Sequence, residues 1–520
     1  MVPSAIQDDV GAHDDSTGHC ILPVKNPLTS FWLKEPHELG DYRSTPDLPE
    51  RSDVVIIGGG YAGVATAYHL LKQSPGENFS ITLLEARGVC TGATGRNGGH
   101  LRPDMYGHIG KHMARAGREA GAEVARFEVD NMWAIKKAIE DEEIECDFTL
   151  TRSVDVWCNE EGAKKAKAAY DFLVSQDLEY MKDVFFITDP SQAEGYSGIK
   201  GAKAAASFTA GTVWPYKFIL SLLQKILQTG RLNLQTNTPV TSIRPDEDCL
   251  DLVVIETERG AIVTPKVVHA SNAYVSGVLP EYVHSIIPCK GTCCHVDTSK
   301  DSSSSARAPP PCLTNSYIIR DENQIVSYLI PRTDGSIIVG GAQTTFRPFR
   351  SQWYGNIDDS VQIDAAKGYY DHYMQRTFRG WEDSAAAVSN TWTGVMGYSF
   401  DTAPHIGPVP SRPGQFIIAG FNGHGMPVIW LSAKGLAEMI LADRKGQKVA
   451  FKETGLPRLF ETSQLRIDRS RKYSEEEGDI LGSGAIFLPR EPTNDRGHEV
   501  KGAVHGRGRD IAIPYLGKND

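Results

Sequence analysis

The first clear pattern of apolar positions lies near the amino end of the chain. Val54–Ile57 is a continuous apolar run of strand length, residues 61–72 carry apolar side chains at helical spacing, and Ile81–Leu84 is a second short apolar run. Two buried strands joined by a helix within about thirty residues predict a parallel βαβ crossover. This unit indicates an α/β protein.

The rest of the chain alternates between the helical period and the strand period. Helical patterns cover residues 117–143, 218–228, 358–378 and 429–442. Strand patterns cover residues 148–157, 211–214, 232–235, 240–243, 252–258, 267–270, 325–331, 336–340 and 416–419. Residues 1–25 are polar, 298–311 are rich in serine and proline, and the chain beyond about 465 is charged and glycine-rich. We expect these last three parts to be disordered or loosely held.

The composition excludes several classes of protein. The 520 residues, 40% hydrophobic and 23% charged, suit a globular protein of roughly two or three domains. A net charge of −11 without a basic tract disfavours nucleic acid as a partner. No membrane association is expected, because no apolar run has spanning length and the amino end lacks a secretory pattern. The odd number of cysteines, 9, indicates reduced thiols and a cytoplasmic location.

One cluster of cysteines and a histidine could suggest a metal site. Cys289, Cys293 and Cys294 are followed by His295. Their spacing fits no common zinc pattern, and the segment has the pattern of a strand. We therefore expect no metal.

A glycine-rich turn joins the first predicted strand to the first predicted helix. Residues 53–64 read DVVIIGGGYAGV, in which Gly58, Gly60 and Gly63 match G-x-G-x-x-G. In this context the first glycine permits a tight turn, the second lets a pyrophosphate approach the backbone, and the third lets helix pack on strand. The positive amino end of the helix would face the phosphates. The turn predicts a dinucleotide-binding site.

Glu85, at the end of the second strand, supports the same interpretation. A carboxylate here accepts hydrogen bonds from the adenosine ribose and repels a 2′-phosphate, which disfavours NADP. FAD and NAD both stay open at this point. The chain continues as EARGVCTGATGRNGGHLRP over residues 85–103. So many glycines and polar groups are typical either of a surface loop or of backbone that lies along a large ligand.

Three separated blocks resemble the D-amino-acid oxidase-like (DAO) superfamily of FAD-dependent oxidoreductases. They are DVVIIGGGYAGVATAYHLL with LLEA, then GATGRNGGH at 92–100, and then WTGVMGYSFDTAPHIGPV at 392–409 with IIAGFNGHGM at 417–426. The resemblance is to the group of γ-glutamylputrescine oxidase, glycine oxidase and sarcosine oxidase. It spans about residues 50–445 and leaves out both ends of the chain and the serine- and proline-rich segment.

The resemblance implies FAD as the cofactor. The first block would hold the pyrophosphate and adenosine, the second would run along the cofactor toward the flavin, and later segments would close over it. The implied cofactor-binding residues are Gly58, Gly60, Tyr61, Ala62, Gly63, Glu85, Ala86, Arg87, Gly92, Ala93, Thr94, Arg96, Asn97, Gly98, Gly99, His100, Val240, Ala270, Ser271, Asn272, Gly420, Gly423, His424, Gly425 and Met426.

The family also implies two catalytic residues. His424, between two glycines, would lie at the flavin and stabilise its reduced, anionic form, and Arg102 would bind a substrate carboxylate. A backbone hydrogen bond is the alternative for His424, and a surface salt bridge or phosphate contact is the alternative for Arg102. Arg96 and His100 could each touch flavin, substrate or only the surrounding chain.

Three departures from the sarcosine oxidase pattern bear on the chemistry. No cysteine lies at the position of the covalent flavin link, near Gly394, so we expect non-covalent FAD. Ile338 stands where that branch has a lysine that assists O2 reduction, which leaves an oxidase and a dehydrogenase both open. Pro427 replaces the lysine that pairs with the arginine, which favours an amine, or an amino acid held differently, over sarcosine.

The expected function is oxidation of the C–N bond of a small amine or amino acid to an imine, with reoxidation of FAD by O2 to give H2O2. A flavin dehydrogenase with another electron acceptor is the nearest alternative. An NAD-dependent dehydrogenase and a non-catalytic protein that keeps FAD for structure are the others.

The expected fold is α/β: a discontinuous, Rossmann-like FAD-binding domain with a second α+β substrate domain built on a mainly antiparallel sheet. An amino-terminal arm over 1–50 and a carboxy-terminal tail over 461–520 would flank them. The FAD-binding domain would comprise 51–115, 208–287 and 390–460, and the substrate domain 116–207 and 288–389.

Overall fold

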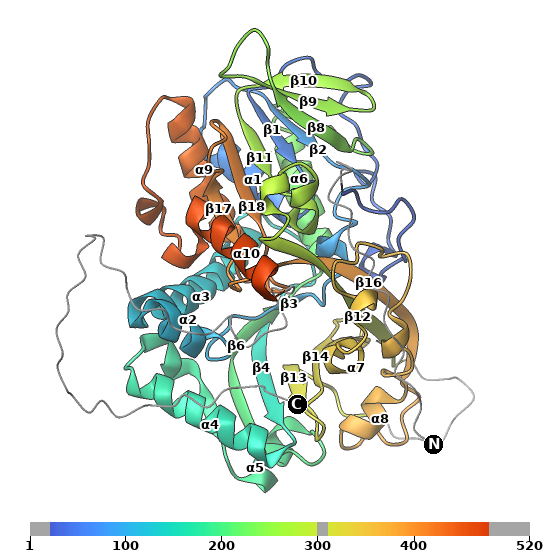
Figure 1. Cartoon of the computed structure of the whole chain (residues 1–520). Coiled ribbons are helices and arrows are strands. Elements are labelled where there is room, and N and C mark those ends of the chain that lie inside the picture. The colour runs from blue at the N-terminus through green and yellow to red at the C-terminus, as the bar shows by residue number, and fades with distance from the viewer. Residues whose placement is uncertain (1–20, 299–309, 478–520) are drawn as a thin grey trace, which may run out of the picture.

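A computed structural model describes residues 21–298 and 310–477 (Figure 1). Most of the segment 298–311, which was expected to be disordered, and the part of the expected tail beyond residue 477 lie outside the described residues. Within the ranges described, no helix combines the length and the apolar character needed to cross a bilayer.

The parallel βαβ unit near the amino end is confirmed. β1 (Val54–Ile57) pairs in parallel with β2 (Ile81–Leu84), and α1 (Tyr61–Gln73) connects them. Every residue of both strands is buried, as expected for parallel strands covered on both faces.

The sheet around this unit is assembled from distant parts of the chain. Its order is β17-β18-β11-β1-β2-β7, and its pairs are parallel except for β17 with β18. Figure 1 shows helices α1, α6 and α9 beside it in one half of the molecule. The elements added to the βαβ unit are α6 (Pro215–Leu227), β7 (Leu232–Gln235), β11 (Val267–His269), β17 (His405–Pro408), β18 (Gln415–Ala419) and α9 (Ile429–Arg444).

Two further sheets complete the architecture. A small antiparallel sheet consists of β8 (Val240–Pro245), β9 (Val253–Thr257) and β10 (Gly260–Thr264). The large sheet is mainly antiparallel and has the order β16-β12-β15-β14-β13-β4-β6-β3, with β5 beside β6 and only β13 and β4 parallel among its described pairs. Its strands are β3 (His100–Leu101), β4 (Thr149–Trp157), β5 (Phe185–Ile187), β6 (Ala204–Thr212), β12 (Ile286–Asp297), β13 (Ser316–Arg320), β14 (Val326–Pro331), β15 (Ile337–Gly341) and β16 (Ala387–Ser399). The expected α/β class, with a mainly antiparallel second sheet, is confirmed.

Side chains on the two faces of the large sheet pack into different hydrophobic cores. On β15, Ile338 packs into the core shared with the six-stranded sheet, whereas Ile337 and Val339 pack into a separate core. This separate core includes side chains of α5 (Pro190–Ser197) and α8 (Tyr373–Thr377). Alternate residues of each strand therefore face either the six-stranded sheet or these helices.

The helices differ from the pattern in three places. Gly117, with φ of 90°, separates α2 (Ile109–Ala116) from α3 (Arg118–Asp141) at the start of the expected helix. The helix expected over 358–378 is wrong: only a 3-10 turn and the five-residue α8 form there. The residues expected to begin a loose tail form α10 (Gln464–Glu477). The remaining α-helices of the described residues are α4 (Glu160–Ser175) and the four-residue α7 (Gln343–Phe346).

The described part of the amino-terminal arm packs on the body. Trp32 is fully buried, and its indole N–H donates to the carbonyl of Asn97. Ser30 donates to the carbonyl of Gly95 over 2.5 Å. The arm is thereby bonded to the second glycine cluster.

Candidate functional site

One cavity of about 470 Å³ collects most of the residues that the sequence singles out. Its size is that of a small-molecule or cofactor site. Of the expected cofactor-binding and catalytic residues, those that line it are Gly58, Gly60, Tyr61, Ala62, Glu85, Ala86, Arg87, Gly92, Ala93, Thr94, Arg96, Asn97, Gly98, His100, Arg102, Val240, Ala270, Ser271, Asn272, Gly423, His424, Gly425 and Met426.

Gly63, Gly99 and Gly420 are the expected residues that do not line the cavity. A Cβ on Gly63 would lie 1.9 Å from the carbonyl oxygen of Gly58, and one on Gly99 would lie 2.6 Å from that of Val213. Gly420 has φ of 77°, and its N–H donates to the Asn272 side chain at 3.0 Å. These glycines let segments of backbone approach each other beneath the cavity wall.

The glycine turn opens α1 toward the cavity. Gly58 adopts φ of 114°, and a Cβ there would lie 2.7 Å from the carbonyl oxygen of Ala270. Gly60, which has no side chain, is the amino-terminal cap of α1. The first turn of the helix therefore faces the cavity without a capping side chain of its own, as anion binding requires.

Glu85 lies in the cavity wall, just after the carboxyl end of β2. One carboxylate oxygen accepts the N–H of Gly59 at 2.7 Å, and the other accepts the N–H of Arg87 at 2.8 Å. Burial raises the pKa of the Glu85 carboxyl above its usual value, although these backbone hydrogen bonds act in the opposite direction. Each oxygen is oriented by one bond and keeps a second acceptor position.

The second glycine cluster is bonded to the first. The hydroxyl of Thr94 accepts the N–H of Tyr61 at 2.9 Å, which links the cluster to the first turn of α1. The side chain of Asn97 donates to the carbonyl of Thr94 at 2.9 Å and accepts the N–H of Gly99 at 2.7 Å. The stretch is thus an ordered wall of the cavity rather than a loose surface loop.

Arg87 and Arg96 meet the same buried carboxylate, that of Asp359. Arg87 lies 3.0 Å and Arg96 3.2 Å from its oxygens, and the side chain of Asp359 is only 1% exposed. Arg87 also donates to the carbonyl of Val24 at 3.0 Å, and Arg96 donates to that of Leu28 at 2.6 Å. Burial lowers the pKa of Arg96 to about 10. Both hydrogen-bonded guanidinium groups therefore hold the amino-terminal arm and the loop around Asp359 beside the cavity.

His100 is neutral at physiological pH. Its Nε2 lies 2.7 Å from the hydroxyl of Ser316. Burial, with the nearby charges of Arg102 and His424, holds the pKa of His100 well below its usual value. An imidazole in this state can line the cavity without adding charge.

Arg102 reaches the cavity from the strand end after His100. Its guanidinium lies 2.8 Å from a carboxylate oxygen of Asp155 and 4.6 Å from the centre of the Phe208 ring. Asp155 is fully buried and also accepts the hydroxyl of Tyr106 at 2.8 Å. Arg320 approaches the same carboxylate at 3.7 Å. Arg102 and Arg320 thus share the Asp155 carboxylate, and the carboxylate of Asp104 also acts on Arg102.

His424 lines the cavity from the loop after β18. Its Nε2 lies 2.7 Å from Glu128 on α3. Burial lowers the pKa of His424, but the charges of Glu128 and Asp104 outweigh it, and the net shift is upward. The site therefore contains a cationic arginine and a histidine with an increased tendency to be protonated.

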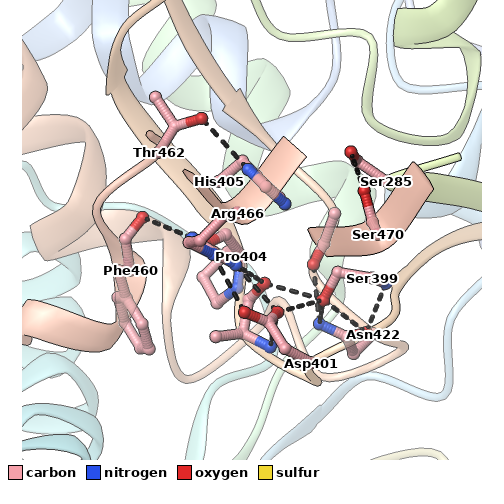
Figure 2. A network of polar contacts seen from close by, with 12 residues as sticks. Ser285, Ser399, Asp401, Pro404, His405, Asn422, Phe460, Thr462, Arg466 and Ser470 are labelled. Atoms are coloured by element: carbon pink, nitrogen blue, oxygen red, sulfur yellow. Dashed lines mark hydrogen bonds and ion pairs between the residues drawn. The ribbon is translucent and has the colours of Figure 1, made fainter. Parts of the chain in front are cut away.

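A polar network joins Asn422, two residues before His424, to the turn that contains Asp401 (Figure 2). The side-chain oxygen of Asn422 accepts the N–H of Ser399 at 2.7 Å, and Ser399 donates to the carbonyl of Ala403 at 2.7 Å. Asp401, in the same turn, forms a two-bonded ion pair with Arg466 of α10 at 2.8 and 2.9 Å. The carboxy-terminal helix thus anchors the turn behind the His424 loop.

The ion pair of Asp401 predicts a pH-dependent stability. Arg466 and Arg115 hold the pKa of Asp401 well below its usual range despite burial. A depressed folded pKa contributes stability above the unfolded value, about 3.9, and loses it as the pH falls toward the folded one. We expect Asp401→Asn to lower the free energy of unfolding by about 2 kcal/mol at pH 7. Urea unfolding should show this difference shrinking below about pH 4; a difference independent of pH would contradict the assignment.

Several residues of the cavity wall carry no sequence motif. Tyr328 lines the cavity, and its hydroxyl lies 2.8 Å from the sulfur of Cys293. Arg332, on the same part of the chain, does not line the cavity: it packs on the ring of Trp32 and binds Asp147 at 2.6 Å. Ile21, Leu22 and Pro23 also line the cavity, together with Met396 and Tyr398, which belong to the third sequence block but were not among the expected site residues.

The residues present fit FAD. Ser271 lines the cavity, and its buried hydroxyl has no hydrogen-bond partner within the described part of the chain, so a polar ligand could satisfy it. A Cβ on Gly92 would meet no atom within 4 Å, which leaves backbone accessible along the wall. Together with Glu85 and the amino end of α1, these groups suit ribose, pyrophosphate and a long isoalloxazine-bearing chain.

Comparison with known proteins identifies the family. A family model described as FAD dependent oxidoreductase (DAO) matches residues 53–439. The chain belongs to this family of FAD-dependent oxidoreductases, and its cofactor is FAD. The whole amino-terminal arm and α10 lie outside the matched residues, although Ile21, Leu22 and Pro23 of the arm line the cavity and α10 binds the turn at Asp401.

Individual relatives are distant. The gamma-glutamylputrescine oxidoreductase of Escherichia coli (strain K12) is 24% identical over 398 residues, which cover 75% of this chain and 84% of that protein. The solved L-proline dehydrogenase from P. horikoshii has a TM-score of 0.60 at 21% identity and covers 83% of this chain and 100% of its own. Glycine oxidase from Geobacillus kaustophilus has a TM-score of 0.59 at 20% identity and covers 78% of this chain and 97% of its own. The structural likeness shows the fold.

Proposed function

We propose that the protein oxidises the C–N bond of an amine or amino acid to an imine. The observation that carries the proposal is the single cavity, lined both by Glu85 and the glycine turn and by Arg102, Tyr328 and His424. The names of the relatives, gamma-glutamylputrescine oxidoreductase and glycine oxidase, support this substrate class. FAD, when bound, supplies the two-electron acceptor for this oxidation.

The proposed binding roles follow the cavity wall. Glu85 accepts hydrogen bonds from the ribose hydroxyls, and the first turn of α1 faces the pyrophosphate. Ser271 donates its free hydroxyl to the cofactor. Residues 92–98 lie along the cofactor, and Gly423, His424 and Gly425 lie at the flavin. The FAD-binding domain is then 51–115, 208–287 and 390–460, and the substrate domain 116–207 and 288–389.

The charge of the cavity favours a substrate that carries a carboxylate beside a neutral amine. Among the described residues that line the cavity, Glu85 is the only carboxylate, and it belongs to the proposed ribose site. Arg102 and His424 interact electrostatically, so both act on the same part of the cavity. An ammonium group would find no anionic partner there, whereas a carboxylate would be attracted. Arg102 is the proposed partner of that carboxylate.

Replacing Arg102 tests this role. We expect Arg102→Lys to raise KM for a carboxylate-bearing amine about tenfold and to change KM for a simple amine much less, because lysine keeps the charge but loses the planar two-bonded geometry. Steady-state kinetics on the two substrates measure the difference. Equal effects on both would show that Arg102 acts through the structure of the wall instead.

FAD is proposed to be bound non-covalently. Gly394 lies in the cavity wall where the related branch has its linking cysteine. The cavity histidines His100 and His424 are bonded to Ser316 and Glu128. Acid precipitation is therefore expected to leave the yellow flavin in the supernatant. A yellow pellet that survives washing would contradict this expectation.

The final electron acceptor is proposed to be O2, with H2O2 as product. The proposal follows the family resemblance, in which other members lack the assisting lysine and still use O2; here the fully buried Ile338 of β15 supplies no cation. The test is a peroxide-release screen of the FAD-loaded protein over amines and amino acids. Flavin bleaching under anaerobic conditions without peroxide in air would favour the alternative, a dehydrogenase. A protein that cannot take up FAD, or that no candidate bleaches, would contradict the proposal.

A further inference from the structure

Glu128 is a buried carboxylate that none of the cofactor motifs includes. It lies on α3, is 4% exposed, and places one oxygen 2.7 Å from Nε2 of His424. We propose that Glu128 is a positioning residue that holds His424 as an imidazolium facing the cavity and thereby makes the bound flavin easier to reduce. This inference rests on the proposed placement of the flavin beside His424.

The hydrogen bonds of Glu128 indicate which atom donates in its contact with His424. The same oxygen of Glu128 that faces His424 also accepts the backbone N–H of Asp104 at 2.6 Å. A backbone N–H can only donate, so this oxygen accepts there, and as a carboxylate oxygen it also accepts the hydrogen of His424 Nε2. The loop leaves His424 little freedom, because Gly423 adopts φ of 71° and the N–H of His424 donates to Phe421 at 2.8 Å.

The charged groups around His424 shift its pKa in opposite directions. Glu128 and the carboxylate of Asp104 raise the pKa of His424, while burial and Arg102 lower it, and the net shift is upward. Asp104 is itself bonded to His108 at 2.6 Å. His100 is held neutral and does not compete for the proton. The protonation of His424 therefore depends on the carboxylate of Glu128 more than on any other hydrogen-bonded group.

The pair is neutral overall, but only its positive member lines the cavity. Glu128 itself is absent from the cavity wall, so its negative charge lies behind the imidazolium. Such an oriented pair stabilises negative charge that develops on a ligand in front of it. Because no lysine occupies the Ile338 position, this pair and Arg102 supply the positive potential at the proposed flavin position.

The test compares Glu128→Gln, which keeps the shape and removes the charge, with Glu123→Gln on the same helix. Glu123 forms a surface ion pair with Arg458 and serves as the matched control. In the FAD-loaded protein, NMR titration of His424 should show its pKa about one unit lower in Glu128→Gln. The equilibrium constant for flavin reduction by a reference dye should fall about tenfold, or about 30 mV for two electrons. Glu123→Gln should change neither quantity.

A second variant separates electrostatics from folding. In a His424→Asn background, Glu128→Gln should no longer change the dye equilibrium. The proposal is overturned if His424 of the unmodified protein titrates below about 6.5, which needs no variant. It is equally overturned if the dye equilibrium of Glu128→Gln matches that of the control. Dye reduction requires no substrate, so a failed amine screen with these results intact would count against the proposed substrate class alone.

Discussion

Gly63→Ala is expected to prevent tight FAD binding and to destabilise the fold. The new Cβ would lie 1.9 Å from the carbonyl oxygen of Gly58 and 3.3 Å from the side chain of Ile56. Gly58 cannot move away from this Cβ, because the backbone of Ala270 lies close to Gly58. This clash is relieved only if α1 moves away from β1, and that movement opens the turn that faces the pyrophosphate.

We expect this overpacking to cost about 3 kcal/mol of stability and to weaken FAD binding about 100-fold. Urea unfolding and fluorescence titration of the apoprotein with FAD measure the two effects. Gly195→Ala on α5 is the matched control, since a Cβ there meets no atom within 4 Å and the backbone is helical. The control should be neutral or slightly more stable. Unchanged FAD affinity in Gly63→Ala would show that the turn does not hold the cofactor.

The glycine turn could be predicted because its cause is local. The βαβ unit around Gly58 and Gly63 requires only two short apolar runs, a helical pattern and glycines at fixed spacing, all within 35 residues of one another. The helix expected over 358–378 failed for the opposite reason. Gly368 and His372 adopt φ of 75° and 51°, and the segment before them is bonded through Asp359 to residues about 270 positions away. Long-range bonds override the local pattern there.

The carboxylates behind the site could not be predicted in the same way. Asp155 and Asp359 meet arginines that lie 53 and 272 positions away in the chain, and one sequence contains no signal for such pairs. The sequence does contain a signal for Glu128. It lies four residues after Val124 and next to Phe127, on the apolar face of the pattern over 117–143. A carboxylate on a buried face needs a partner, and that rule alone would have marked it.

The amino-terminal arm shows how parts outside the family match complete the site. Ile21, Leu22 and Pro23 line the cavity, and a Cβ on Gly277 would lie 2.7 Å from the backbone of Ile21. The arm is held there by the arginine bonds to Val24 and Leu28. The cavity is therefore closed on this side by a segment whose position depends on a few buried bonds.

Asp359→Asn should release this segment. The carboxylate faces two buried arginines, Arg87 and Arg96, and the N–H of Leu28 donates to its backbone carbonyl at 2.9 Å. Removing its charge leaves both guanidinium groups without a buried counterion, so we expect a loss of about 3–5 kcal/mol in the free energy of unfolding. FAD should also dissociate at least about tenfold faster, because the arm is no longer held against the cavity.

Urea unfolding and the rise of flavin fluorescence on dilution measure these two losses. Asp364→Asn, which breaks an exposed pair with Lys367 nearby, should change stability by less than about 1 kcal/mol and leave FAD release unaltered. A deletion of residues 1–27 distinguishes the two causes, since it removes the part of the arm that lines the cavity but keeps the buried ion pairs. Faster FAD release in the deletion, without the full loss of stability, would assign cofactor retention to the arm and stability to Asp359. If the deletion holds FAD as firmly as the whole chain, the arm does not close the cavity, and only the stability role of Asp359 stands.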